Sequence, residues 1–325
     1  RTRDRRDAPP DRVPRACGHR QCCHFVRTRR GRGQRVADVR VYNRVISEGR
    51  PEAIYLFTEQ LVNGVGRGDQ APNGERLALE GTRNTRDIGG YRTADGMTVR
   101  RGVVFRSDGL DGLTASDVRQ LSALGIRTVI DLRGPQERAA GGAAAGGLGA
   151  TGVTLHAISL FAEEDVVALF RGPLDGTAHP LVAYYLSILE RRADGIRSVI
   201  EHLGHPNPPL PALIHCSAGK DRTGIVVALL LAIAGVDHDT IAADYARTAE
   251  YLDAAWLETR RADAARWGID WDRYTRAYEA PPDVISTTLR MLETKYGGVS
   301  GYLARIGVPH DSLSRVRDRL RDAAG

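Results

Sequence analysis

A single α/β domain, with helices on both faces of a central twisted sheet of four or five strands, is the fold class that this sequence predicts. Two observations support it. From Arg76 onward, short apolar segments alternate with helical patterns and with Gly, Pro and Asn turn signals. The short apolar segment Ala212–His215 leads through a brief loop into the apolar helical pattern of residues 222–235. A strand that is followed in this way by a helix is typical of an open α/β sheet.

Four strands and several helices can be placed from local patterns. Strands are predicted at Val103–Arg106, Thr128–Leu132 and Val153–Ile158, besides Ala212–His215. Thr114 and Asp117 have the spacing of a helix N-terminus, and Gly125 is expected to end that helix. A long helical pattern covers residues 180–203 and is expected to break or bend around Asp194-Gly195, and further helices are predicted over 238–325. The Ala/Gly-rich stretch 139–149 is expected to be a mobile loop.

The first 50 residues differ in composition from the rest of the chain. They contain 15 Arg and five acidic residues, without a helical or strand period, which predicts a disordered extension. A nucleic-acid-binding arm is the alternative. A cluster of thiols and imidazoles here imitates a zinc site, but its ligands are closer together than the usual paired spacing: Cys17, His19, Cys22, Cys23 and His24. Residues 51–75 are expected to form a linker with a helix at 51–66, and residues 76–325 the catalytic domain.

Charge and hydropathy argue against several functional classes. Residues 51–325 carry 31 basic and 35 acidic residues, so the body gives no electrostatic reason to expect nucleic acid as a partner. The longest apolar run, Ile225–Val236, is too short to span a bilayer, and no secretory signal pattern is visible. We expect a cytoplasmic protein, or one secreted without a recognisable signal peptide. The 44 Arg against two Lys favour a bacterial source with GC-rich codons.

The segment His215–Gly224 (HCSAGKDRTG) carries the clearest chemical signal. A Cys and an Arg separated by five residues, between a strand and an apolar helix, make a cradle for phosphate. The backbone N–H groups of the loop converge on an anion, and Gly219 permits a conformation that a side chain would obstruct. The predicted phosphate-binding residues are Ser217, Ala218, Gly219, Lys220, Asp221 and Arg222.

The same residues suggest a reaction. Arg222 offers a planar fork for two phosphate oxygens, and the thiolate of Cys216 is favoured over the thiol in this field. Cys216 is then the nucleophile, and water hydrolyses the resulting phosphocysteine. Thr223 is expected to assist the thiolate as leaving group, and His215 to support the loop from behind. We expect no metal ion and no cofactor. A buried structural cysteine in a strand-to-helix turn is the alternative for Cys216 alone.

The loop resembles the His-Cys, five residues, Arg-Ser/Thr pattern of the protein tyrosine phosphatase superfamily. Neighbouring segments resemble its bacterial branch of tyrosine/lipid phosphatases, which has mycobacterial members: Asn84–Tyr91, Arg101–Ser107, Asp131-Leu-Arg133, Gly298–Leu303 and Gly307-Val-Pro. The resemblance runs from about residue 77 to 324. It implies a tyrosine-phosphatase-like fold. Phosphotyrosine proteins or phosphoinositides are the implied substrates, with phosphoserine and phosphothreonine as further ones; a phosphate-binding module without turnover is the alternative.

A proton donor for the leaving group remains to be chosen from the acidic residues. Many relatives carry an Asp on a separate loop 30 to 40 residues before the cysteine, but that window holds no acid here; Asp175 and Asp194 flank it. The resemblance favours Asp221 as general acid, against a role in capping the helix or pairing with Arg222. The resemblance makes Asp131 the second catalytic candidate, as acid or as the group that orients Arg222; a purely structural role is the alternative.

Two further expectations concern the surroundings of the loop. Lys220 is predicted to add a second cation at the mouth of the cradle, as in phosphoinositide phosphatases; a solvated lysine at the loop edge is the alternative. Residues 238–285 mix aromatic and charged side chains on helical stretches. In the branch that this sequence resembles, helices after the cysteine loop cover the site, so a lid is a hypothesis here and simple packing against the body its alternative.

Overall fold

The computed structural model describes residues 74, 76–141, 147–161, 179–266 and 268–322. All of them fall within one compact unit, Gln70–Gly325. The predicted extension, the helix at 51–66, the cluster between Cys17 and His24 and Asp175 lie outside the described residues. Those expectations therefore stay predictions.

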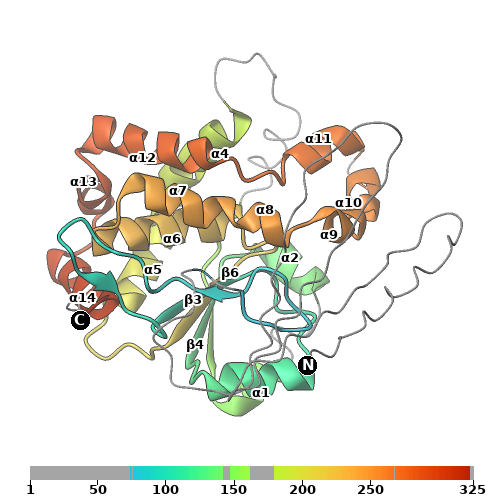
Figure 1. Cartoon of the computed structure of the whole chain (residues 1–325), viewed down its shortest axis with the longest axis horizontal. Helices are drawn as coiled ribbons and strands as arrows, with labels where there is room; N and C mark the ends of the chain where they lie inside the picture. Colours follow the sequence, from blue (N-terminus) through green and yellow to red (C-terminus); the bar gives the residue numbers. More distant parts are fainter. Residues whose placement is uncertain (1–73, 75, 142–146, 162–178, 267, 323–325) are drawn as a thin grey trace, which may run out of the picture. The chain divides into compact units, whose positions relative to one another are not determined.

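The centre of the described chain is a five-stranded sheet, as the sequence predicted (Figure 1). Its order is β1-β3-β6-β4-β5, with bounds Arg86–Asp87, Val104–Ser107, Ala212–His215, Thr128–Asp131 and Thr154–Ala157. The last four strands are parallel, and the two-residue β1 pairs antiparallel to β3. Because His215 lies opposite Ser107 on one side and Asp131 on the other, all three strands end at the same edge of the sheet.

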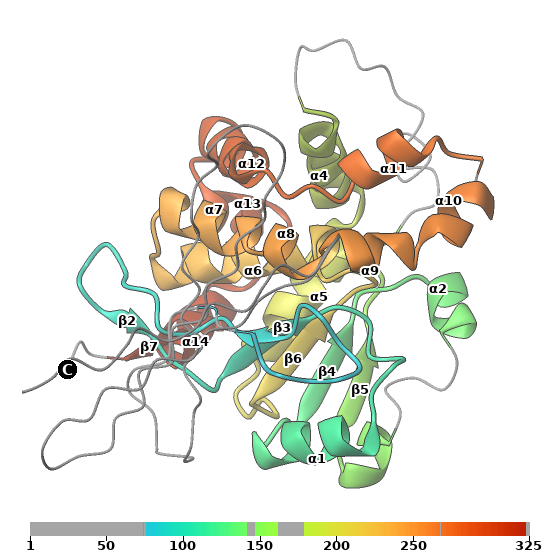
Figure 2. The same cartoon turned by 45° about the vertical axis from the view of Figure 1, so that its right-hand side comes forward.

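Helices lie on both faces of the sheet, with α1 on one of them (Figure 2). Alternating residues of the strands belong to two separate cores, one on each face. Phe105, Val129 and Leu213 pack with Leu121 of α1 (Ala115–Ala123) and with Leu148 of the short helix η1 (Leu148–Thr151). The intervening residues of the strands, Val104, Ile130, Ala212 and Ile214, belong to the larger core on the other face. The period of two along each strand therefore gives the three-layer architecture.

The larger core is built around α6 (Asp221–Ala234), most of whose residues are buried. Because it is apolar on all sides, other helices can surround it. The remaining helices are α2 (Pro135–Ala140), α4 (Pro180–Arg191), α5 (Ala193–Leu203), α7 (His238–Ala246), α8 (Thr248–Tyr251), α9 (Ala254–Glu258), α10 (Arg261–Arg266), α11 (Trp271–Arg276), α12 (Pro282–Tyr296), α13 (Val299–Arg305) and α14 (His310–Leu320). Helices α4, α7, α13 and α14 contact α6 directly.

Two local predictions can be compared with the structure. The Thr114 side chain accepts a hydrogen bond from Asp117 N, and the Asp117 carboxylate accepts one from Thr114 N, which confirms the predicted helix start. The helical pattern over 180–203, for which a break or bend was predicted around Asp194-Gly195, forms two helices, and the break falls at Arg192. The short sheet formed by β2 (Thr98–Val99) and β7 (Arg321–Asp322) was not predicted.

Within the described ranges, the structure contains no helix that is both long and apolar enough to cross a membrane.

Candidate active site

Cys216 lies at the carboxyl end of β6, the middle strand of the sheet, where it begins the loop that leads into α6. Its thiol is free and its residue is almost fully buried. In open α/β sheets, ligands bind beyond the carboxyl ends of the strands. The cysteine is therefore placed at the edge of the sheet where a ligand site is expected.

The carbonyl groups of Cys216, Ser217, Ala218 and Gly219 all accept hydrogen bonds from groups that surround the loop. The bonds are His215 Nδ1 to Cys216 O (3.2 Å), Gly109 N to Ser217 O (2.9 Å), Asn84 Nδ2 to Ala218 O and Gly219 O (3.1 Å each) and Arg106 Nη2 to Gly219 O (2.8 Å). In a planar trans peptide, the C=O and the next N–H point in opposite directions. Carbonyls turned outward therefore direct the following N–H groups into the loop, where they can cradle an anion.

The side chains that hold these carbonyls are themselves fixed by a buried ionic cluster. Arg106 Nη1 lies 2.6 Å from Asp244 Oδ2, and Arg86 Nε lies 3.3 Å from Asp244 Oδ1. Arg86 also donates to the side chain of Asn84. Burial alone raises the pKa of Asp244, but the two arginines outweigh it, so the pKa lies below its ordinary value. Arg86 thus supports the loop through Asn84. The carboxylate of the neighbouring Asp87 accepts from Gly89 N and Gly102 N.

Gly219 is required by the close approach of the loop to β3. It has φ +66°, and an added Cβ would lie 2.4 Å from Ser107 O. We expect Gly219→Ala to lower the free energy of unfolding by about 1–3 kcal/mol, because both the backbone conformation and the contact are unfavourable. Gly152→Ala is the matched control, since Gly152 has φ +84° with nothing within 4 Å of the added atom. Urea denaturation measures both; an equal loss would show that the Ser107 contact costs nothing.

Arg222 is held by a carboxylate that the sequence analysis did not identify. Its Nη1 and Nη2 donate to Oε2 and Oε1 of Glu137 in α2, at 2.6 and 2.8 Å, and Ser217 Oγ donates to Oε1 at 2.5 Å. Burial by itself lowers the pKa of Arg222, but the charges of Cys216 and Glu137 raise it above its ordinary value. Glu137 also accepts from Gly134 N at 2.8 Å as the third residue of α2. The sequence Gly134-Pro135 followed by Glu137 indicates a helix start, but it does not indicate that Glu137 binds Arg222.

One donor of Arg222 is left over. Its Nε is buried and has no hydrogen-bond partner in the part of the chain that the structure describes. Buried polar groups are nearly always paired, so an unpaired donor beside a cysteine in this loop fits a bound oxyanion. Phe161 lies against the guanidinium, 5.3 Å from the ring centroid to Cζ. The geometry suits an arginine whose two terminal nitrogens are fixed and whose remaining donor serves the ligand.

The pairing of Glu137 with Arg222 predicts an acid-sensitive contribution to stability. Burial raises the pKa of Glu137, but Arg222 and Ser217 outweigh it, so the pKa lies below its ordinary value of 4.5. A depressed pKa contributes stability that is present above pH 4.5 and lost as the pH falls through the depressed value. We expect Glu137→Gln to lose about 1–3 kcal/mol at pH 7 and to show a shallower loss below pH 4.5 than the native chain. Urea midpoints at pH 7 and pH 4 measure this. Glu80→Gln, at an exposed position, is the control; the same acid slope in the native chain and Glu137→Gln would contradict the assignment.

Asp221 is positioned by Tyr185 of α4 and by its neighbour Lys220. Its Oδ1 accepts from the Tyr185 hydroxyl at 2.8 Å and lies 3.0 Å from Lys220 Nζ. The hydroxyl of Tyr185 is in turn 2.6 Å from that of Tyr245. Burial, and next the charge of Asp221, raise the pKa of Tyr185 well above its ordinary value, so Tyr185 stays protonated and able to donate. Tyr185 lies within the sequence window in which we sought an acid.

Lys220 points toward the segment Ala277–Glu279. Its side chain is fully buried, and Nζ donates to Ala277 O and, at 3.1 Å, to Glu279 O. The ammonium group also lies 5.9 Å from the ring centroid of Tyr278. These contacts differ from both positions considered from the sequence, a cation at the open mouth and a solvated side chain. The carbonyls of the covering segment hold the charge instead.

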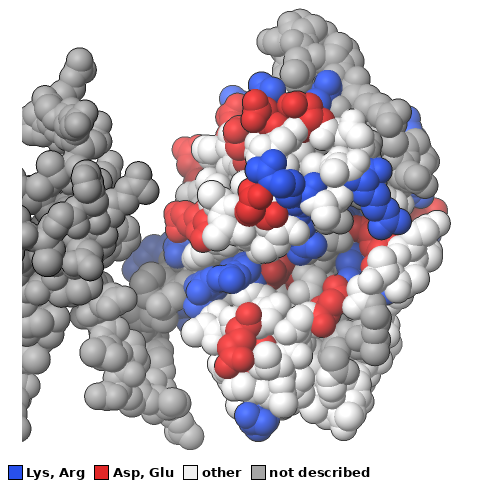
Figure 3. All heavy atoms as spheres, turned by 90° about the vertical axis from the view of Figure 1, so that its right-hand side faces the viewer, with Lys and Arg blue, Asp and Glu red and all other residues white. Residues whose placement is uncertain are grey.

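Part of the region 238–285 covers the loop. Ala218 packs in one cluster with Leu252 and Trp256, and the Trp256 ring meets Tyr278 edge-on at 5.3 Å. By contrast, Trp271 and Tyr274 stack on each other in a separate cluster. Figure 3 shows acidic and basic side chains interleaved on this side of the molecule, without a patch of one sign. The predicted lid thus has contacts with the loop, while its movement stays a hypothesis.

The other predicted site residues are Asp131, His215 and Thr223. Asp131 accepts from Nε and Nη2 of Arg133 (3.0 and 2.9 Å) and lies 3.7 Å from Nε2 of His215. Burial raises the pKa of Asp131, but Arg133 and His215 bring it below its ordinary value. Burial lowers the pKa of His215, which favours the neutral ring. Thr223 Oγ1 is buried and makes no hydrogen bond to any described residue. The partner that the structure gives Arg222 is Glu137, and not Asp131.

Comparisons with known proteins identify the family of the chain. The model of the tyrosine phosphatase family matches residues 77–322. The chain is 31% identical over 238 residues to a tyrosine-protein phosphatase of Nostoc commune, covering 67% of this chain and 74% of that protein. It is 28% identical to the triple specificity protein phosphatase PtpB of Mycobacterium tuberculosis, over 74% of this chain and 98% of that one. The crystal structure of Pseudomonas aeruginosa TpbA is similar at a TM-score of 0.27 and 21% identity, covering 58% of this chain and 97% of that chain. From the family match over most of the described residues, the chain belongs to the tyrosine phosphatase family.

Proposed function

We propose that the chain hydrolyses phosphotyrosine in proteins through a phosphocysteine intermediate on Cys216. The observation that carries the proposal is the loop itself. Its carbonyls are bonded to surrounding groups, so that its N–H groups face the position beside Cys216. Arg222 is buried there with a raised pKa and a free Nε donor among the described residues. Such a site stabilises the charge of a phosphoryl group in the transition state without further reorganisation.

The reaction then proceeds in two displacement steps at phosphorus. In the first, the Cys216 sulfur forms a bond to phosphorus while the bond to the tyrosyl oxygen breaks, and an acid protonates that oxygen. In the second, water attacks phosphorus and gives up a proton to the same group, now a base. The S–P bond breaks, which releases inorganic phosphate and restores the thiolate. Arg222 and the loop N–H groups bind the three non-bridging oxygens in both steps.

Asp221 is the group to which we assign the proton. One of its oxygens is fixed by Tyr185 and Lys220, and its side chain retains 19% exposure, so the carboxylate is held in place without being sealed from solvent. Asp131 is less suited, because Arg133 binds both of its oxygens and its pKa is lowered. Tyr185 and Lys220 then position the acid, and they do not react themselves.

The range of substrates is a separate question from the chemistry. The name of the mycobacterial relative states triple specificity for that protein. For this chain, the family match supports phosphotyrosine as the first substrate to test. Phosphoserine peptides and phosphoinositides are the comparisons, because the same loop chemistry applies to any phosphate monoester that can reach Cys216.

Rapid-quench trapping tests the mechanism. The purified, reduced chain is mixed with a phosphotyrosine peptide carrying labelled phosphate and denatured within milliseconds. We expect label bound covalently to the peptide that contains Cys216, and a burst of released tyrosyl peptide before steady turnover. The same experiment is repeated with a phosphoserine peptide and with phosphoinositide vesicles to rank the substrates. Binding of phosphotyrosine peptide without label on Cys216 and without phosphate release would instead favour a phosphate-binding module.

A further inference from the structure

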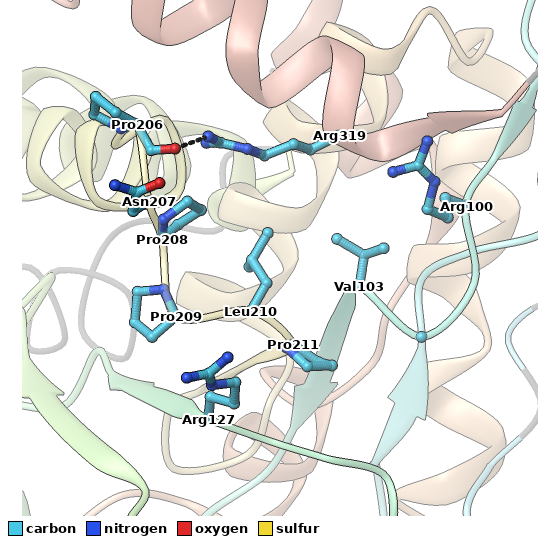
Figure 4. A pocket seen from close by; sticks show the side chains of 11 residues that line it. Arg100, Val103, Arg127, Pro206, Asn207, Pro208, Pro209, Leu210, Pro211 and Arg319 are labelled. Atoms are coloured by element: carbon cyan, nitrogen blue, oxygen red, sulfur yellow. Dashed lines mark hydrogen bonds between the residues drawn. The ribbon is translucent and has the colours of Figure 1, made fainter.

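A cavity of about 630 Å³ lies at the amino ends of the central strands, at the opposite end of the sheet from Cys216. Its walls include the residues that come just before β3, β4 and β6, namely Val103, Arg127 and the segment Pro206–Pro211. Arg100 and Arg319 complete it (Figure 4). The cavity is open to solvent on one side, and its volume lies within the range of small-molecule sites.

The charged side chains that line this cavity are all arginines. Figure 4 shows Arg319, Arg100 and Arg127 on three sides of Leu210. Arg100 is partly balanced by Asp322, with Nε 2.7 Å from Oδ1, in an exposed pair. Arg319 donates to the carbonyls of Leu203 and Pro206, at 2.8 and 2.9 Å, which fixes its position but leaves its charge uncompensated. Arg127 is exposed and makes no ion pair with a described residue.

Neighbouring charged residues of α14 also act on Arg319. Burial and, next, the nearby charge of Arg315 lower the pKa of Arg319 below its ordinary value, with Asp318 acting in the opposite direction. The prolines of the segment have no N–H to donate and present apolar rings. Recognition in this cavity therefore depends on guanidinium groups around an apolar wall, a combination that suits an anion with a carbon skeleton.

We propose that this cavity binds a small organic anion that bears at least two phosphate or carboxylate groups. The guanidinium groups of Arg100, Arg127, Arg319 and Arg315 together with the carboxylates of Asp322 and Asp318 leave two positive charges to balance, which calls for more than one negative charge on the ligand. Each guanidinium can bind an oxyanion through two N–H donors, while the prolines and Leu210 contact the skeleton. The site concerns binding alone, so it does not depend on the phosphatase mechanism at the other end of the sheet.

The cavity is connected to the strands that carry the active site. Arg127 N donates to Pro211 O at 2.9 Å, and Ala212 N donates to Val103 O at 3.0 Å. A ligand that contacts Pro206–Pro211 therefore touches the start of β6, the strand that ends at Cys216.

Calorimetric titration of the full chain carrying Arg222→Ala tests the proposal, because this change removes the phosphate clamp of the active site. The probes are inorganic pyrophosphate and citrate, which distinguish phosphate from carboxylate ligands. We expect saturable binding of at least one probe, weakened about tenfold or more by adding Arg127→Glu, since hydrogen bonds to charged groups contribute this much. Arg119→Glu makes the same charge change at an exposed position of α1 and should leave the affinity unchanged. Absence of binding by both probes, or equal affinities in the Arg127 and Arg119 variants, overturns the proposal.

Discussion

Replacing Cys216 by Ser is expected to reduce hydrolysis of a phosphotyrosine peptide on the order of 10⁴-fold or more. A hydroxyl in the same position is a far weaker nucleophile than a thiolate, and the loop contains no second thiol. The phosphate cradle should survive, because its N–H groups and Arg222 do not depend on the sulfur atom for their positions. Steady-state phosphate release measures the loss, and peptide binding by the variant shows that the site remains.

The control for this change is a variant that impairs the phosphate cradle but keeps the sulfur atom of Cys216. Arg222→Lys keeps the positive charge but removes the planar fork that Glu137 holds, so it should impair both binding and turnover. Cys216→Ser should impair turnover alone. A Cys216→Ser chain that retains more than about a tenth of the native rate, in a folded state by circular dichroism, would exclude the phosphocysteine mechanism.

Asp221→Asn is expected to slow hydrolysis by about 10²–10⁴-fold for substrates whose leaving group needs a proton. The amide retains the shape and can still interact with Tyr185, but it cannot supply the proton. An aryl phosphate with a strongly acidic phenol as leaving group needs no such help, so its rate should fall much less. The hydrolysis rates of a series of aryl phosphates, plotted against the acidity of the phenol that leaves, measure the difference.

Tyr185→Phe and Asp239→Asn complete this experiment. Tyr185→Phe removes the hydrogen bond to Asp221 Oδ1 and should reproduce the leaving-group dependence with a smaller loss of rate. Asp239→Asn makes the same carboxylate-to-amide change at an exposed position of α7 and should have no effect. An equal loss for all leaving groups in Asp221→Asn would show that Asp221 serves the helix terminus or Lys220, and not the proton transfer.

The parts of the fold that follow from neighbouring residues were predictable. The apolar segment 212–215, the loop with Gly219 and the apolar helix are consecutive in the chain, so their strand–loop–helix arrangement is encoded locally. The helix start at Thr114 was predictable for the same reason, because a capping box joins residues three apart. The exact position of the break at Arg192 was less predictable, because the packing of the two helices can place the break at any of several neighbouring residues.

The contacts of the site residues were not predictable from neighbouring residues. From sequence alone, Lys220 was expected to face the substrate and Asp131 was considered as the group that orients Arg222. In the fold, Lys220 binds the carbonyls of Ala277 and Glu279, and Asp131 binds Arg133. Glu137 and Tyr185 reach the loop from α2 and α4, which are far from it in the chain. No periodicity or spacing connects residues at such separations.

The sequence by itself determined the chemistry that this protein presents: a cysteine, an arginine and a glycine-containing loop between a strand and a helix, all within ten consecutive residues. The tertiary structure alone decided which side chains neutralise, orient and cover that loop. The physical reason is that the loop's geometry arises from local backbone conformation, whereas its partners are chosen by the packing of α2, α4 and the segment Ala277–Glu279 around it.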